Sequence, residues 1–138
     1  TVGRGSTSFS NSTNKDEFLA LGGQITVGTS ATAGVIEAWV FAQSADTVWP
    51  DLFTAAYSGS DGGFTVRSRD ILAAGAKKLA TMVVSSGTNI PYSFGPDDIA
   101  SLFGWVPSTC GLFVTHSTGV NLNSTSGNHF VHRVGSYF

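Results

Sequence analysis

Charged side chains are scarce in this sequence. Asp, Glu, Lys and Arg make up 12% of its 138 residues, about half of the share of about 25% that is usual in a soluble domain. Ser and Thr occupy many of the positions that charges would otherwise fill. Because freely moving proteins use interspersed charge to stay apart, this surface favours a subunit of an assembly, although some secreted β domains have the same composition.

Basic runs and long apolar runs are also missing. The formal net charge is −2, and without clustered Lys and Arg the chain is not expected to bind nucleic acid. No apolar run approaches the length of about 20 residues that a membrane-spanning helix needs, so no membrane partner is predicted. The first residues lack a signal-peptide pattern, and Thr1 is what remains when an initiator Met is trimmed, which indicates an unprocessed cytoplasmic product.

The single cysteine excludes an internal disulfide framework. Cys110 leads into an apolar stretch, which predicts a buried structural thiol. Of the three histidines, His129 and His132 are three residues apart and point to opposite faces of a strand, so they cannot chelate one ion through that segment. His116 could lie beside one of them, but no Cys/His pair has structural-zinc spacing. The chain is therefore predicted to hold no metal and no cofactor.

Signatures of catalysis are absent as well. The sequence contains no Gly-x-Ser-x-Gly motif and no glycine-rich loop between a strand and a helix that could bind phosphate. Most carboxylates stand at positions that predict helix caps or turns, which argues against a glycosidase pair. The prediction is that the chain is not an enzyme. A small hydrolase would require His116 or His132 within hydrogen-bond reach of a serine, cysteine or carboxylate.

What the sequence does contain is short alternating stretches typical of strands. Residues 110–120 and 129–134 alternate and together predict a C-terminal hairpin at the centre of the domain. Residues 35–42 are apolar on both faces, which is typical of an inner strand. Glu37 is the one charge in that stretch and is predicted to lie at a strand end or to face solvent.

Helices are predicted at two places. Residues 69–75 favour a short helical turn, with Asp70 as a possible cap, followed by a strand that ends near residue 84. Residues 97–103 predict a short helix capped by Asp97 and stopped by Gly104. The apolar residues within 45–57 predict a loop packed over one end of the core.

These elements predict an all-β fold, an antiparallel sandwich or barrel of six to eight short strands with Gly/Ser/Asn turns. Residues 18–138 are expected to form a single domain, with residues 1–17 as a flexible N-terminal arm. The arm is polar and rich in Gly, Ser, Thr and Asn, and it is either a loose tail or a segment that becomes ordered on a neighbouring subunit, with Phe9 as its anchor.

Four segments carry a resemblance to a known family: AGVIEAWVFA, WPDLF, YSFGPDDIASLFG and GLFVTHSTGVNLNSTSGNHFV. They resemble small virion structural proteins of tailed bacteriophages, over roughly residues 18–135 and in the same order. In size and hydroxyl-rich surface the chain is similar to capsid cement (decoration) proteins, such as that of a Bordetella phage. The resemblance implies a jelly-roll-like β-sandwich that is assembled in the host cytoplasm and binds the outside of an icosahedral capsid. It also implies a non-enzymatic role, in which a homodimer or homotrimer bridges subunits of the major capsid protein.

A protein of this kind would work by surface contact. The polar, uncharged residues 117–119 and 121–128 could present backbone and hydroxyl groups to a neighbour. The candidate partner-binding residues are Phe9, Asn11, Trp49, Phe53, Thr118 and Asn123. An alternative prediction is a tail or receptor-binding module that binds carbohydrate, with Trp49, Tyr92 or Trp105 as a stacking platform.

Overall fold

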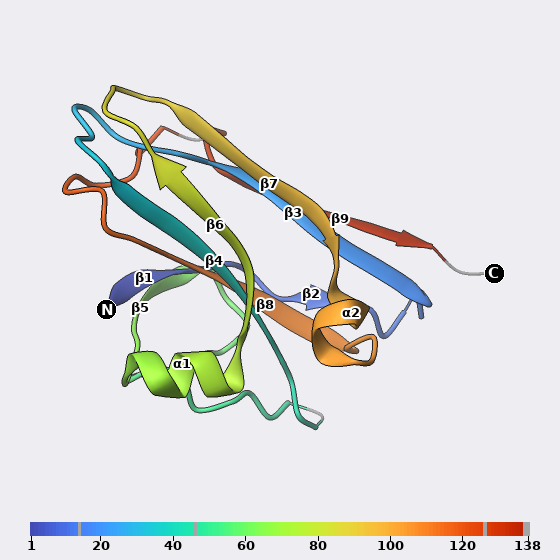
Figure 1. The fold of residues 1–138 in the computed structure, drawn as a ribbon. Coiled ribbons are helices and arrows are strands. Elements are labelled where there is room, and N and C mark those ends of the chain that lie inside the picture. Colours follow the sequence, from blue (N-terminus) through green and yellow to red (C-terminus); the bar gives the residue numbers. More distant parts are fainter. Residues whose placement is uncertain (14, 46, 126, 137–138) are drawn as a thin grey trace.

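Two antiparallel sheets pack face to face in the computed structural model of the chain (Figure 1), which describes residues 1–13, 15–45, 47–125 and 127–136. Sheet A contains β5 (Gly62–Thr65), β1 (Val2–Gly5), β8 (Thr109–His116), β4 (Gly34–Ala42) and β6 (Lys77–Val84) in that order, with β2 (Phe9–Ser10) also paired to β8. Sheet B contains β7 (Pro91–Asp98), β3 (Phe18–Thr26) and β9 (Phe130–Ser136). Two helices, α1 (Arg69–Gly75) and α2 (Ile99–Phe103), complete the described elements. The predicted all-β sandwich is confirmed.

Sheet A is the middle layer of three (Figure 1), because its central strands are buried on both faces. Ile36 and Ala38 of β4 face sheet B, whereas Trp39 and Phe41 face the opposite side. The same division holds in β8, where Phe113 belongs to the outer side. This double burial explains why both strands are nearly continuous apolar runs in the sequence.

Helix α1 and the loop before it cover the outer face of sheet A. Ser68 caps α1 by accepting a hydrogen bond from the Ile71 amide at 3.1 Å, so the cap is Ser68 and not Asp70. A Cβ at Gly75 would lie 2.6 Å from Leu52 Cδ2, so glycine lets the helix approach the loop closely. The loop was expected over one end of the core; its buried Leu52 and Phe53 instead pack on the face of sheet A.

Helix α2 closes one end of the space between the sheets. It begins at Ile99 and its cap is Asp98, which accepts from the Ala100 amide at 2.9 Å. The predicted start at Asp97 was wrong because Asp97 still belongs to β7, where it pairs with Leu21. Ile99 is fully buried against residues of both sheets.

The predicted C-terminal hairpin is also wrong, although both of its strands exist. β8 pairs with β1, β2 and β4, whereas β9 pairs with β3 in the other sheet. Residues 117–129 carry the chain from one sheet to the other, and Leu122 bridges to Val27 on the way. Alternation defines a strand's faces but not its neighbour, so adjacent strands in the sequence were mistaken for partners.

The N-terminal residues are not a flexible arm in this structure. β1 lies between β5 and β8, and β2 extends the pairing with β8. A Cβ at Gly3 would lie 2.2 Å from the Val114 carbonyl oxygen and 2.5 Å from the Phe113 ring. In the sequence alone, the glycines of this segment indicate a flexible tail. Instead, the absence of a Cβ at Gly3 lets β1 pair closely with β8.

Candidate binding groove between the sheets

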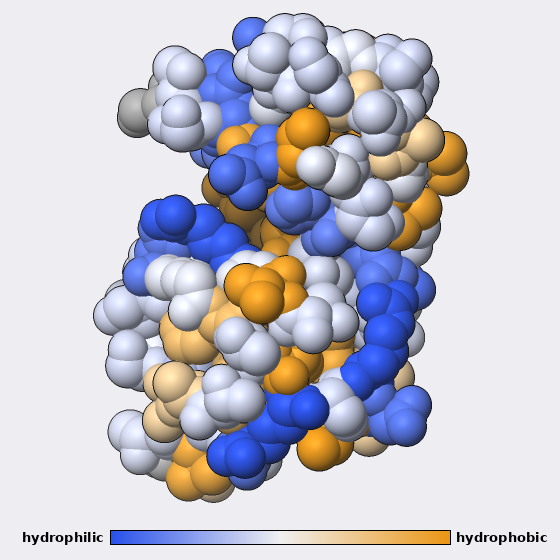
Figure 2. All heavy atoms as spheres, turned by 90° about the vertical axis from the view of Figure 1, so that its left-hand side faces the viewer, coloured by the Kyte–Doolittle hydropathy of each residue, from blue (hydrophilic) through white to orange (hydrophobic). Residues whose placement is uncertain are grey.

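A hollow opens between the two sheets, on the side of β1, β2 and β9. We call it the intersheet groove; its volume is about 860 Å³, within the range of about 300–1,000 Å³ typical of ligand sites. Figure 2 shows a hollow between two lobes, with hydrophobic atoms inside and hydrophilic atoms beside its opening. The inner surface is lined by apolar residues of both sheets and of the segment between β8 and β9, among them Phe9, Ile25, Leu112, Val114, Leu122 and Val131.

One rim of the groove carries an ion pair between β1 and the turn before β5. The Arg4 guanidinium donates to both carboxylate oxygens of Asp61, with Nε–Oδ1 at 2.8 Å and Nη2–Oδ2 at 2.5 Å. The hydrogen bond from Arg4 lowers the pKa of Asp61 below its ordinary value. Both groups are more than a third exposed, so the pair contributes little to stability. Because the two charges of Arg4 and Asp61 offset each other, this rim of the groove carries no net charge from the pair.

The opposite rim is a network of backbone and side-chain hydrogen bonds around His129. Its Nδ1 accepts from the Thr26 amide at 3.2 Å, so Nε2 carries the proton and donates to the Asn123 carbonyl oxygen at 2.5 Å. The Asn123 amide group donates to Asn89 at 2.8 Å, and its oxygen accepts from Thr125 and Asn128. Both ring nitrogens and the Asn123 side chain are therefore bonded within the chain.

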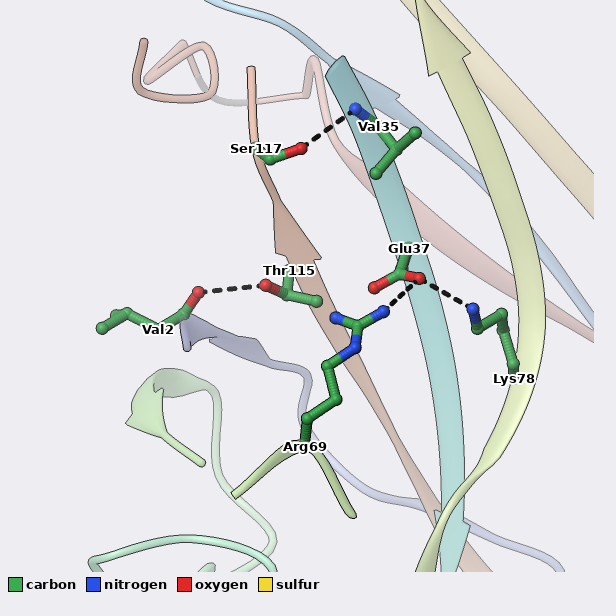
Figure 3. A network of polar contacts seen from close by, with 7 residues as sticks. All are labelled: Val2, Val35, Glu37, Arg69, Lys78, Thr115 and Ser117. Atoms are coloured by element: carbon green, nitrogen blue, oxygen red, sulfur yellow. Dashed lines mark hydrogen bonds and ion pairs between the residues drawn. The ribbon is translucent and has the colours of Figure 1, made fainter. Parts of the chain in front are cut away.

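A second polar cluster lies on the outer face of sheet A (Figure 3), away from the groove. Glu37 Oε1 accepts from Arg69 of α1 at 2.6 Å and from Lys78 of β6 at 2.7 Å. Burial raises the pKa of Glu37, but the hydrogen bonds from Lys78 and Arg69 outweigh it and the net shift is downward. Both cations also lie over the Trp39 ring, with Arg69 Cζ at 5.8 Å and Lys78 Nζ at 4.9 Å from its centroid.

This cluster corrects the interpretation of Glu37 as a solvent-facing residue. The residue is 5% exposed in the middle of β4 and fastens α1 and β6 to that strand. Nearby, Thr115 donates to the Val2 carbonyl oxygen, and Ser117 accepts from the Val35 amide (Figure 3). Because its carboxylate is already paired with two cations, the cluster serves structure rather than chemistry.

The six candidate partner-binding residues do not form one site. Phe9 and Asn123 both line the intersheet groove, Phe9 on its inner surface and Asn123 in the hydrogen-bond network at its rim. Asn11, Phe53 and Thr118 are only 7%, 2% and 0% exposed, so their side chains have little surface to offer a partner.

Trp49 is half-buried in the loop over sheet A. Its ring packs edge-to-face on Phe41 and Tyr57, with centroid distances of 5.5 and 4.7 Å. Of the other proposed stacking platforms, Tyr92 is half-buried and accepts from the Ser85 amide at 2.9 Å. Trp105 is 48% exposed beside Phe103. None of these three rings lines the intersheet groove.

Cys110 and His116 have structural surroundings. Cys110 is fully buried, and burial raises the pKa of its thiol to about 12, as expected for a packing residue. The Thr118 hydroxyl donates to the Val120 carbonyl oxygen, so His116 Nδ1 donates to that hydroxyl at 3.0 Å. Burial lowers the pKa of His116. The prediction of a buried thiol is confirmed.

Within the part of the chain that the structure describes, no group of three or more His, Cys, Asp or Glu is placed to hold a metal ion. No described helix has the length and apolar content that crossing a membrane would need. Comparisons with protein-family models, with curated proteins and with solved structures found no match.

The groove itself was missed by sequence reasoning. Leu112 and Val114 lie within residues 110–120, which the sequence predicts only as a strand at the centre of the domain. The groove exists because sheets A and B separate on the side of β1 and β9, and a strand pattern carries no signal of that separation.

Proposed function

We propose that this chain is a non-enzymatic structural protein of a tailed-bacteriophage virion. It binds the outside of the icosahedral capsid and stabilises it by bridging subunits of the major capsid protein. The observation that carries the proposal is the intersheet groove, which is apolar inside and has rim groups already bonded to one another. Such a groove suits an apolar side chain of a protein neighbour.

The polar groups around the groove support a binding role over a catalytic one. General acid–base catalysis needs a side chain that can exchange a proton with the reacting group. Arg4 and Asp61 bond to each other, and both nitrogens of His129 bond to this chain's backbone. The low charge of the sequence and its resemblance to cement proteins support the same proposal.

The decisive experiment is to locate and count the protein in purified virus particles. We expect it on isolated heads, in a fixed ratio to the major capsid protein. Heads that lack it should release their DNA at a lower temperature than complete heads. Finding the protein only on isolated tails would contradict a role on the capsid.

The groove can be tested by a charged, bulky substitution at its mouth. Thr7 is exposed and lines the groove, so Thr7→Arg should weaken binding to heads without unfolding the protein. Thr29→Arg is the matched control, because Thr29 is also exposed but lies outside the groove. Equal binding by both variants would show that the groove does not contact the capsid.

A second candidate function is a tail or receptor-binding module, and the exposure of Trp105 favours it. Its ring lies 5.9 Å from that of Phe103 and is 48% exposed, so a sugar could stack on it. Binding of the protein to host-cell glycans, lost in Trp105→Ala, would support this function over capsid cement.

A further inference from the structure

Among the described residues, the two sheet orders end in the strands β5, β6, β7 and β9, and the first three of these are protected against pairing with another chain. β5 has four residues, two of them glycine. β7 contains Pro91 and Pro96, which cannot donate backbone hydrogen bonds. β6 begins with two lysines and lies beside β7, where Tyr92 accepts from the Ser85 amide. These are the usual devices by which natural sheets avoid edge-to-edge association.

β9 is the exception. It has seven residues, contains no proline or lysine, and pairs with β3 without a register shift. Its one charged residue, Arg133, turns inward: Nη1 donates to the Ser10 carbonyl oxygen at 2.6 Å, and Nη2 lies 3.7 Å from Asp16 Oδ2. Because the Arg133 guanidinium is bound within the chain, its charge does not keep another strand from pairing with this edge.

The outer face of β9 is apolar as well. Phe130 and Val134 are 49% and 45% exposed, and His132 lies between them. The residues of β3 that pair with them are Gln24, Gly22 and Ala20, so β3 adds no charged side chain to this face of sheet B. An unprotected edge with an uncharged, partly apolar face is suited to another β-strand.

We infer that two copies of this chain pair through β9, antiparallel about a two-fold axis, so that the two B sheets become one continuous sheet. The partner strand is β9 of a second copy, because the side chains of β9 complement those of an antiparallel β9. With His132 opposite His132 of the other copy, Phe130 faces Val134 of the other copy, and this aromatic–β-branched pair occurs twice. The same register places Arg133 opposite Val131 of the other copy.

Neighbouring registers fit less well. A two-fold axis through Arg133 would place two arginines directly opposite each other, which is unfavourable. Registers shifted by an odd number would pair an outward with an inward side chain. The dimer gives a definite form to the homodimer or homotrimer that the resemblance to cement proteins implies. It involves no capsid contact, so either idea can fail without the other.

Site-directed crosslinking tests the register. Residues paired across antiparallel strands have Cα atoms about 4.5–5.5 Å apart, within the reach of a disulfide. His132→Cys should therefore form a covalent dimer under mild oxidation. Val134→Cys should not, because residue 134 and its copy would lie about 13 Å apart along the strands. The wild-type chain is the background control, since Cys110 is fully buried.

Sedimentation of the unmodified chain tests the dimer itself. The wild-type protein should sediment as a dimer, and Val134→Lys should dimerise about tenfold more weakly because each dimer loses the Phe–Val pair twice. Val83→Lys is the matched control, because Val83 is 75% exposed on the edge strand β6. It should remain a dimer, and thermal unfolding should show both variants folded.

Three results would overturn the inference. They are a wild-type monomer at high concentration, crosslinking of Val134→Cys in place of His132→Cys, or dimer loss in Val83→Lys instead of Val134→Lys. If Val134→Lys dimerises more weakly and still binds heads as well as wild type, the β9 dimer is supported and the capsid contact lies elsewhere on the chain. If wild-type dimers form as predicted but never bind heads, the proposed function fails and the dimer stands.

Discussion

Sheet A and sheet B have different surroundings. Sheet A is covered on one face by sheet B and on the other by α1 and the loop before it, so that Phe41 and Phe113 are 0% exposed. Sheet B is buried on one face only, and Phe130 and Val134 remain exposed on the other. The difference indicates that sheet A is the scaffold and that sheet B presents a surface.

The largest expected effect comes from removing an aromatic ring from each sheet. Phe113→Ala should lower the free energy of unfolding by about 3–5 kcal/mol, because it opens a cavity among closely packed rings. Phe130→Ala should lower it by no more than about 0.5 kcal/mol in dilute protein. Denaturant unfolding monitored by circular dichroism measures both, and equal losses would contradict the division between scaffold and surface.

The next effect compares a buried carboxylate with an exposed one. Glu37→Gln should lower the free energy of unfolding by about 1–3 kcal/mol, since two cations lose their charged partner. Asp51 pairs with Arg67 but its side chain is 76% exposed, so Asp51→Asn should change stability by less than about 0.5 kcal/mol. Chemical denaturation of the two variants in parallel is the measurement. If Asp51→Asn lowers the free energy of unfolding more than Glu37→Gln does, the ion pairs of Glu37 do not stabilise the contact of α1 and β6 with β4.

Glu37 also predicts a dependence of stability on pH. Its pKa in the folded protein lies below the ordinary value of 4.5, so the unfolded chain binds this proton more readily. The stabilisation is present above pH 4.5 and is lost as the pH falls through the folded-state pKa. The free energy of unfolding should fall less steeply between about pH 5 and about pH 3 in Glu37→Gln than in wild type. Parallel curves for the two proteins would contradict this assignment.

The smallest effect is expected at His116, at the end of β8. Burial lowers its pKa below 6.5, so the folded state favours the neutral ring. This contribution is present above pH 6.5 and is lost as the pH falls through the folded-state pKa. His116→Asn should remove a shallow slope in stability just below pH 6.5. Titration of the histidine ring protons by NMR should give a midpoint below 6.5; a midpoint above it would contradict the burial argument.

Local patterns predicted the strands better than their partners. The double-sided apolar run of residues 35–42 identified an inner strand, because burial on both faces leaves a direct mark on composition. The short helix at residues 69–75 and the following strand were also predicted correctly. The pairing of β8 and β9 was not, because the choice of neighbour depends on contacts distant in sequence.

Ambiguous residues account for the remaining errors. Gly3 and Gly5 are consistent with a loose tail or with a strand lying close over aromatic rings, and only the positions of Phe113 and Phe64 decide between them. Glu37 in an apolar strand gave no indication that Arg69 and Lys78 would reach it. Phe9 and Asn123 were predicted separately as contact residues; the groove that both line depends on how the two sheets diverge.

Amide hydrogen exchange at two protein concentrations tests the contrast between the sheets most directly. The amides of β8 should be strongly protected at both concentrations, because they lie in the centre of a sheet covered on both faces. The amides at the free edge of β9 should exchange quickly in dilute protein and become protected as the concentration rises. Unchanged exchange in β9, or exchange in β8 as fast as at that edge, would contradict a rigid sheet A beside a pairing edge in sheet B.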